Sequence, residues 1–415
     1  MREVSGKVQR DFSVVVTKGF YKNLKYLLLI NRWVGLFPIS VYKKGDGYML
    51  QWSWLKVILG NVIVLLIAVL TLWCTLASYS VEKVYDIRVK GLAALISNIA
   101  EIFMLFVTWM IGQWSISVKF KEFWTFLLYL LKIDDLMGQP DPSKKTWLLL
   151  PIILLTLTCL TLDAYMWAKL IIPFTGTFAY LWKCLPFYFP YAFVMILQVN
   201  FWITVREIKI RLGKFNGLIS GFIHVTDARG KRVSRDGPRS RIEFLSNNGK
   251  VDFKDRAVTI KSFIKIYESI AKASYALNAF FGLSISVILF NIIICIVITP
   301  YVLYQQLFHS GEQTFLFTQS FWMICHILRM LLFVEPYHNA QLEGIKTKKL
   351  VIKLLLLDLP EDVHKEVKTL LVLINGNKIE FNANGMTSIN RTLFPKIGGA
   401  VFTYLAILFQ YKNSP

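Results

Sequence analysis

Long apolar segments separated by shorter polar ones dominate the pattern of this 415-residue chain. A transmembrane helix needs about 20 mostly apolar residues, whereas a strand of a membrane barrel needs about ten residues that alternate. Seven segments have the length and the unbroken apolar character of helices: 57–79, 92–116, 147–168, 178–205, 275–301, 315–334 and 393–411. The pattern therefore predicts an all-α membrane protein with seven transmembrane helices.

Stretches outside these segments have patterns of their own. Residues 18–38 mix apolar clusters with Lys, Asn and Arg, which predicts an amphipathic helix lying on the membrane surface. Residues 206–215 and 257–272 have helical spacing, so we expect the fourth and fifth spans to continue as helices beyond the membrane. Residues 228–250 are rich in Arg, Gly, Ser and Asn, a composition typical of a disordered loop.

The segment before the last span carries two further apolar stretches. Residues 346–359 are interrupted by charges and are too short to cross a membrane. Pro360, followed by Glu361 and Asp362, predicts the start of a second helix that reaches about Ile374. These two helices could pack on extensions of the same chain or form an interface between subunits, and the pattern leaves both possibilities open.

The distribution of charge indicates how the chain is threaded. Only 18% of the residues are charged, yet the formal net charge is +21. The N-terminal segment and alternate loops hold 38 Lys and Arg, whereas the remaining loops and the C-terminal tail hold 5. Because basic residues accumulate in cytoplasmic loops, we expect the N-terminus in the cytoplasm and the C-terminus outside. This orientation excludes a G-protein-coupled receptor, and it assigns the positive charge to contact with anionic membrane lipid, not with nucleic acid.

Threaded in this way, the chain divides into six regions. The first three are a cytoplasmic N-terminal segment with the amphipathic helix (1–51), transmembrane helices one to four (52–205), and a cytoplasmic loop with helix extensions (206–272). The last three are helices five and six (273–336), the cytoplasmic anchor helices (337–391), and the seventh helix with a short extracellular tail (392–415).

The sequence offers no signal for catalysis or for a cofactor. It contains no P-loop, HExxH or GxSxG motif, and its five histidines are scattered. All five cysteines lie within the apolar spans without CxxC spacing, which favours packing residues over a disulfide framework or a metal site. We therefore expect neither an enzyme nor a bound cofactor or metal. A secondary transporter of small organic solutes stays open as an alternative, although the sequence lacks the inverted repeats typical of transporters.

The end of the last span carries the most specific motif. Residues 403–411 read TYLAILFQY: a Thr-Tyr pair, five apolar residues, and then Gln410 and Tyr411. This closely resembles the terminal signature of insect gustatory receptors, in which Tyr411 replaces the usual phenylalanine. Residues 378–402 also resemble this family through a phenylalanine, a polar turn with glycine, and a Gly-Ala pair.

The resemblance implies both a fold and a function. The fold is the one shared with insect odorant receptors, a tetramer in which the last helix of each subunit lines one central pore and cytoplasmic helices join the subunits. The function is a tastant-gated, nonselective cation channel in the plasma membrane of gustatory receptor neurons. Its partners would be a small-molecule tastant, other subunits of the same family in a homo- or heterotetramer, and membrane lipid.

Positions three and four residues apart in the last span form one stripe along a helix. They are Lys396, Ala400, Thr403, Ile407 and Gln410. In the pore that the resemblance implies, Ile407 could close the channel by dewetting and the Gln410 amides could replace part of a cation's hydration shell, with Tyr411 adding to the gate. On pattern alone, Gln410 could instead mark the boundary between lipid and water.

Polar and aromatic residues in the outer halves of the spans are the candidates for ligand binding, because polar groups inside a membrane are costly. The polar candidates are Asn98, Glu101, Asp163, Thr318 and Gln319, and the aromatic candidates are Tyr165, Trp167, Tyr180 and Trp322. Gln319 and Trp322 are three residues apart, so they can offer a hydrogen bond and a stacking surface to one ligand. We expect an amphipathic ligand, with a bitter or plant-derived tastant favoured over a sugar.

Overall fold

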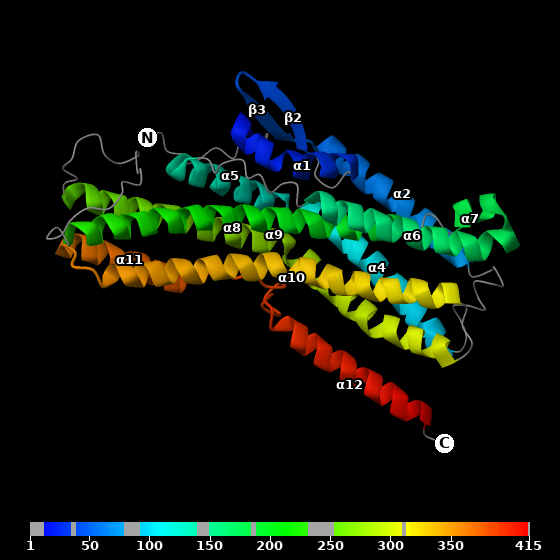
Figure 1. The fold of residues 1–415 in the computed structure, drawn as a ribbon. Helices are drawn as coiled ribbons and strands as arrows, with labels where there is room; N and C mark the ends of the chain where they lie inside the picture. The colour runs from blue at the N-terminus through cyan, green and yellow to red at the C-terminus, as the bar shows by residue number, and fades with distance from the viewer. Residues whose placement is uncertain are drawn as a thin grey trace.

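The computed structural model describes residues 12–34, 39–78, 92–138, 149–183, 188–230, 253–308 and 313–413. Its strands are β1 (Ser13–Thr17), β2 (Ile39–Lys44) and β3 (Gly47–Trp52). Its helices are α1 (Lys18–Val34), α2 (Trp54–Ser78), α4 (Leu92–Val118), α5 (Phe120–Met137), α6 (Leu149–Thr175), α7 (Thr177–Lys183), α8 (Tyr188–Gly230), α9 (Phe253–Phe308), α10 (Gln313–Leu355), α11 (Glu361–Gly376) and α12 (Leu393–Asn413). The long helices α8, α9 and α10 pack together, and α12 leaves this bundle at an angle (Figure 1).

Helices lie at the positions of the predicted spans. In the described part of the chain, five of them are long and apolar enough to cross a membrane: α2, α4, α8, α9 and α10. α6 and α12 coincide with the third and the last predicted spans, and α12 contains a shorter apolar stretch, Leu393–Ile407. A mostly helical protein with several apolar helices is thus confirmed, whereas the count of seven spans and the side of each terminus stay predictions.

Residues 178–205 are predicted as one helix, the fourth span. α7 ends at Lys183 and α8 begins at Tyr188, and residues 184–187 lie outside the described chain. The continuity and the start of this span therefore stay a prediction.

The prediction of a separate helix at residues 346–359 is wrong. Residues 346–355 are the last part of α10, which continues through Pro336. Val334, Tyr337 and Ala340 are all fully buried. This spacing packs one face of α10 on the bundle on both sides of the proline, so tertiary contacts outweigh the missing hydrogen bond. The second predicted helix is confirmed as α11, which has two acidic residues in its first turn.

The N-terminal region departs from the all-α prediction. β1, β3 and β2 form an antiparallel sheet in that order. Gly45 takes φ +56° in the loop between β2 and β3, a conformation that glycine adopts without steric cost. The sheet packs on α5, where Trp52 stacks on Phe120 with ring centroids 4.3 Å apart. α1 packs beside the sheet and corresponds to most of the predicted amphipathic helix, while residues 35–38 lie outside the described chain.

α8 and α9 continue as helices beyond their apolar spans, as predicted. The predicted loop between them lies mostly outside the described residues, which stop at 230 and resume at 253. α5, a helix that the pattern does not predict, packs on α9, and α11 packs on α9 and α10. α5 and α11 lie at one end of the molecule and α7 lies at the other (Figure 1). The end with α5 and α11 is the one that the charge distribution assigns to the cytoplasm.

A buried ion triad joins three helices at this end. Arg211 on α8 donates two hydrogen bonds to the Asp134 carboxylate of α5, at 2.8 and 2.7 Å, and a third to Glu207 at 2.8 Å. Its guanidinium also lies over the Phe20 ring of α1, 6.0 Å from the centroid. Burial raises the pKa of the Asp134 carboxyl, and the Arg211 guanidinium acts in the opposite direction. The triad therefore fixes α1, α5 and α8 at one point.

The segment between α11 and α12 is folded onto α9 and α10. Asn278 on α9 donates to the Glu380 carbonyl oxygen at 3.0 Å, and its own side-chain oxygen accepts the Asn382 N–H at 3.3 Å. Arg391, two residues before α12, forms an ion pair with Glu335 on α10, with 2.6 Å between Arg391 Nη2 and Glu335 Oε1. α12 therefore starts from a position that both α9 and α10 hold.

Candidate functional site

Asp163 on α6 lies at the centre of a polar cluster inside the helical bundle. Its side chain is buried, with 4% of the residue exposed. Tyr188, the first residue of α8, donates its hydroxyl to Oδ2 at 2.5 Å, and Trp322 on α10 donates its indole N–H to Oδ1. A buried carboxylate needs such donors, because burying an unpaired charge is costly. Asp163 thereby holds α6, α8 and α10 together.

Glu101 on α4 belongs to the same cluster. Its partner is Tyr191, which lies one turn after Tyr188 on α8. The Tyr191 hydroxyl donates to Glu101 Oε1 at 2.8 Å, and the Tyr191 ring lies against Trp322 with centroids 5.1 Å apart. Trp322 in turn stacks on the imidazole of His326, with centroids 5.4 Å apart. Trp322 thus connects the two carboxylates, one through its N–H and the other through its ring and Tyr191.

One guanidinium lies next to these groups. Arg329 on α10 donates to Gln198 Oε1 at 3.3 Å and to Asn291 Oδ1 at 3.4 Å, and its Nη1 lies 3.5 Å from His326 Nδ1. The side-chain nitrogens of Gln198 and Asn291 are buried without a hydrogen-bond partner among the described residues. Since an unpaired buried donor costs about 1–3 kcal/mol, these two amides are groups that a polar ligand could satisfy.

We call this set of residues the Asp163–Glu101 network. Its members are Glu101, Asp163, Tyr188, Tyr191, Gln198, Asn291, Trp322, His326 and Arg329. They come from α4, α6, α8, α9 and α10, so the network joins the whole core of the bundle. It offers hydroxyl, amide, carboxylate and guanidinium groups beside two aromatic faces, which is the chemistry of a recognition site for a polar organic molecule.

The other five predicted ligand residues lie on α6, α7 and α10: Trp167, Thr318, Gln319, Tyr165 and Tyr180. The first two are buried and the third is half-buried. Tyr165 is 64% exposed, so it lies on the outside of α6. Tyr180 donates its hydroxyl to the Ala164 carbonyl oxygen and so holds α7 on α6. The side chain of Asn98 lies outside the described part of the chain.

Sequence reasoning missed several members of the network. The sequence pattern singles out none of Tyr191, Gln198, Asn291, His326 and Arg329 as a ligand candidate. A signal for the last two was present, because positions 322, 326 and 329 share one face of a helix by four- and three-residue spacing. Ionisable residues on the same face as a candidate tryptophan could have been grouped with it.

α12 packs on the bundle with one face and exposes another face. The predicted pore residues whose side chains the structure describes are all exposed: Ala400, Thr403, Ile407 and Gln410. Leu393 and Ile397 are buried, and Val401 is half-buried, on a different side. At about 100° per residue, the predicted pore stripe is centred roughly 100° away from these three residues. The side chain of Tyr411 lies outside the described residues.

An apolar groove lies where α12 meets α9 and α10. It has a volume of about 400 Å³, and it is lined by Ile296, Ile327, Met330, Leu331, Phe394, Ile397, Gly398, Val401, Phe402 and Leu405. All ten lining residues are apolar or glycine, so the groove suits hydrocarbon and does not suit a charged or hydroxylated ligand. It is therefore a separate feature from the Asp163–Glu101 network.

Comparison with known sequences gives a consistent match. A model of the 7tm chemosensory receptor family matches residues 24–414. The gustatory receptor for sugar taste 43a of Drosophila melanogaster is 29% identical over 254 residues, which make up 55% of this chain and 58% of that receptor. A second Drosophila melanogaster gustatory receptor, 28b, is 26% identical over 218 residues, 50% of this chain and 46% of that protein. The chain thus spans about half the length of the curated relatives it matches.

Comparison with solved structures supports the fold. The insect olfactory receptor OR5 from Machilis hrabei, in complex with eugenol, is similar with a TM-score of 0.61 and covers 94% of this chain and 98% of its own. A second structure of OR5 from Machilis hrabei is similar with a TM-score of 0.56 and 11% identity, and it covers 95% of this chain and 100% of its own. At 12% identity for the first of these, the similarity is one of fold alone.

Proposed function

Since the chain belongs to the insect gustatory receptor family, within the 7tm chemosensory receptors, we propose that it is a ligand-gated, nonselective cation channel that responds to a tastant. In this proposal four subunits form the channel, α12 of each lines a central pore, and the Asp163–Glu101 network receives the ligand. The subunits lie in the plasma membrane of gustatory receptor neurons, with the N-terminus in the cytoplasm.

The two faces of α12 support its role as the pore helix. One face packs on its own bundle through apolar side chains, and the face with Thr403, Ile407 and Gln410 points away from that bundle. In a tetramer with α12 next to the symmetry axis, four copies of this second face would meet. Ile407 would then form an apolar ring that closes by dewetting, and Gln410 would form an amide ring that favours cations weakly.

Substitution of Gln410 tests the pore. We expect Gln410→Ala to change the relative permeability of monovalent cations or the affinity of a pore blocker in cells that express this chain. Gln319→Ala, an amide that is half-buried on α10, is the matched control and should leave ion selectivity unaltered. Unchanged permeation in the Gln410 variant would remove this residue from the pore lining. Currents without gradient-coupled uptake of the ligand would distinguish a channel from a secondary transporter.

Exposed apolar side chains at the end with α5 and α11 support an assembly contact. Leu356, just after α10, is 81% exposed, and Val372 on α11 is 71% exposed. Ile345 on α10 adds a third exposed apolar side chain, at 52%. If this end lies in the cytoplasm, water would cover these side chains in a monomer. We therefore assign these three side chains to the joint between subunits, in addition to the packing of α11 on α9 and α10 of its own chain.

The composition of the network favours a hydroxyl-rich ligand. The unpaired amide nitrogens of Gln198 and Asn291 lie beside Arg329, and Trp322 and Tyr191 offer aromatic faces. A site built to hydrogen-bond hydroxyl groups rejects analogues that lack them, because its buried polar groups stay unpaired. The name of the relative for sugar taste agrees with this chemistry. The sequence-based preference for a bitter or plant-derived compound gains no support, so we take a sugar-type ligand as the proposal.

A ligand panel tests this choice. We expect sugars to evoke currents and their deoxy analogues to be at least about tenfold weaker, the effect of one lost hydrogen bond of about 1.4 kcal/mol. Gln198→Met should raise the half-maximal sugar concentration by a similar factor. Gln113→Met, which removes an amide of α4 that donates to Asn61, is the matched control. A response to bitter compounds without any response to sugars would overturn the ligand class and leave the channel proposal standing.

A further inference from the structure

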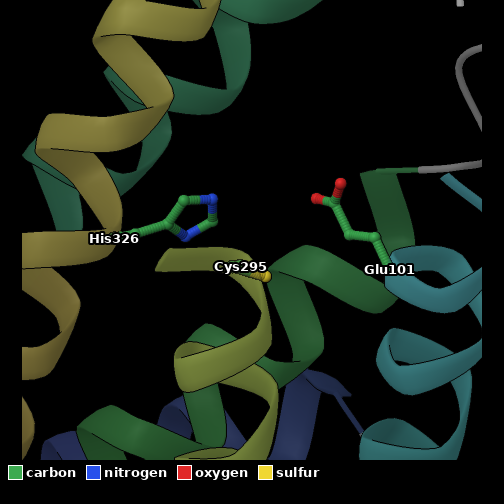
Figure 2. Close-up of side chains that lie close together, drawn as sticks. All are labelled: Glu101, Cys295 and His326. Atoms are coloured by element: carbon green, nitrogen blue, oxygen red, sulfur yellow. The ribbon is translucent and has the colours of Figure 1, made fainter. Parts of the chain in front are cut away.

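Three side chains with metal-binding atoms converge inside the bundle. Glu101 of α4, Cys295 of α9 and His326 of α10 each offer one ligand atom, and these atoms all lie within 4.8 Å of one another. Glu101 and His326 point toward each other from opposite sides, and Cys295 lies between them (Figure 2). We infer that these three residues form a binding site for a divalent transition metal of the zinc class, inside each subunit.

The donor atoms suit this class of metal. Zinc is bound by thiolate, imidazole and carboxylate groups, commonly as three protein ligands with a fourth position left open. Bonds of about 2.0–2.3 Å around a tetrahedral ion place the ligand atoms roughly 3.3–3.8 Å apart. The triad must therefore contract by about 1 Å. Glu101 is the half-buried member with the most rotatable bonds, so its side chain can supply this movement.

The surroundings provide contacts that would orient the ligands. The Tyr191 hydroxyl donates to Glu101 Oε1 at 2.8 Å and so orients the carboxylate. Trp322 stacks on the imidazole of His326 and holds the plane of the ring. Such partners around the direct ligands typically change metal affinity by about 10–100-fold. Two of the three proposed ligands, Glu101 and His326, are therefore each held by a neighbouring side chain.

The charges in the network are also compatible with a divalent ion. With both carboxylates ionised, Asp163, Glu101 and Arg329 carry a formal sum of −1. A divalent ion that displaces the thiol proton of Cys295 brings the sum to zero. Arg329 Nη1 lies 3.5 Å from His326 Nδ1, so Nε2 is the ring nitrogen available to the metal. Arg329 also donates to Gln198 and Asn291.

The spacing of these residues explains why the sequence does not reveal the site. Glu101, Cys295 and His326 lie on three different helices, with none of the short spacings that mark a zinc motif. The metal would tie α4, α9 and α10 together at the level of Trp322. It would therefore stabilise one arrangement of the helices that also carry the proposed ligand site.

Binding can be measured on the purified full-length protein with reduced thiols, without any assay of channel activity. Titration with Co²⁺ should produce a thiolate-to-cobalt charge-transfer absorption in the near-ultraviolet, and Zn²⁺ should abolish this absorption by competition. Zn²⁺ should also raise the thermal unfolding temperature. Absence of the absorption in the unaltered protein would overturn the inference, and this result does not depend on any variant.

Variants identify the ligands. Cys295→Ser should remove the charge-transfer absorption, and Glu101→Gln and His326→Gln should weaken zinc binding by at least about tenfold. Cys74→Ser and His338→Gln are matched controls: Cys74 is a free, buried thiol on α2, and His338 lies on α10 outside the triad. Both controls should bind zinc as the unaltered protein does. Persistence of the absorption in Cys295→Ser, or its loss in Cys74→Ser, would refute the site.

Discussion

Removal of the Asp163 carboxylate should destabilise the bundle and disorganise the proposed ligand site together. Asp163 accepts one hydrogen bond from Tyr188 on α8 and one from Trp322 on α10. Asp163→Ala removes both bonds and leaves the hydroxyl and the indole N–H inside the bundle without this acceptor. Asp163→Asn keeps an acceptor oxygen but removes the charge, so it separates the effect of charge from that of hydrogen bonding.

The magnitude follows from the two bonds. Hydrogen bonds to charged groups contribute about 1.5–3 kcal/mol in soluble proteins, whereas those between membrane helices average about 0.6 and reach about 1.7 kcal/mol. Two charge-assisted bonds in a buried cluster should therefore contribute about 2–4 kcal/mol. We expect Asp163→Ala to lower the free energy of unfolding by this amount and Asp163→Asn to lower it by about half as much.

The assay is unfolding of the purified protein in mixed micelles with a rising fraction of denaturing detergent. Asp135→Ala, an exposed carboxylate on α5, is the matched control and should change the free energy of unfolding by less than about 0.5 kcal/mol. Tyr188→Phe and Trp322→Phe should each cost about half of the Asp163→Ala effect. If Asp163→Ala unfolds like the control, the carboxylate does not hold the three helices together, and the reasoning fails.

Three further predictions concern other parts of the chain. Arg211→Met leaves two buried carboxylates without their partner and should cost about 3–5 kcal/mol of unfolding free energy in the same assay, whereas Lys214→Met should cost far less. Asn390-Arg391-Thr392 has the sequence of an N-glycosylation site, and it should carry no glycan when the protein is expressed in insect cells, because the charge distribution assigns it to the cytoplasm. A glycosidase-sensitive shift in mass would contradict this. Glu335→Gln breaks the exposed ion pair with Arg391 and should shift the ligand concentration for half-maximal current while thermal stability changes little.

The helices were largely predictable because their cause is local. An unbroken apolar run of about 20 residues can form a helix that makes all of its backbone hydrogen bonds internally and has apolar side chains that suit the lipid. Sequence alone therefore indicates where α2, α4 and α9 lie. The sheet was missed although a local signal existed. Residues 39–52 alternate and contain a Gly-Asp-Gly turn, which is typical of a hairpin. This pattern is much shorter than the apolar segments that dominate the chain.

The candidate site was only partly predictable. Asp163 and Glu101 could be singled out because polar groups within a membrane span are costly. Trp322 could be singled out because it shares a helix face with Gln319. Their partners could not be assigned, since which helix faces which depends on packing of the whole bundle. Cys295 shows this most clearly. From sequence it is one of five similar cysteines, and only the fold places it beside Glu101 and His326.

The Asp163–Glu101 network and α12 are mechanically connected through α10. Trp322 and Glu335 lie on this one continuous helix, 13 residues and therefore about 20 Å apart along its axis. Glu335 holds Arg391, just before α12, while Asn278 of α9 holds the preceding turn. Because α10 is one continuous helix, a ligand that displaces Trp322 must either move α10 relative to α9 or bend α10. Bending is unfavourable, because the helix is packed. Since the segment before α12 is attached to both helices, relative movement of the two would reorient α12, and the weakly packed apolar groove beside it offers little resistance.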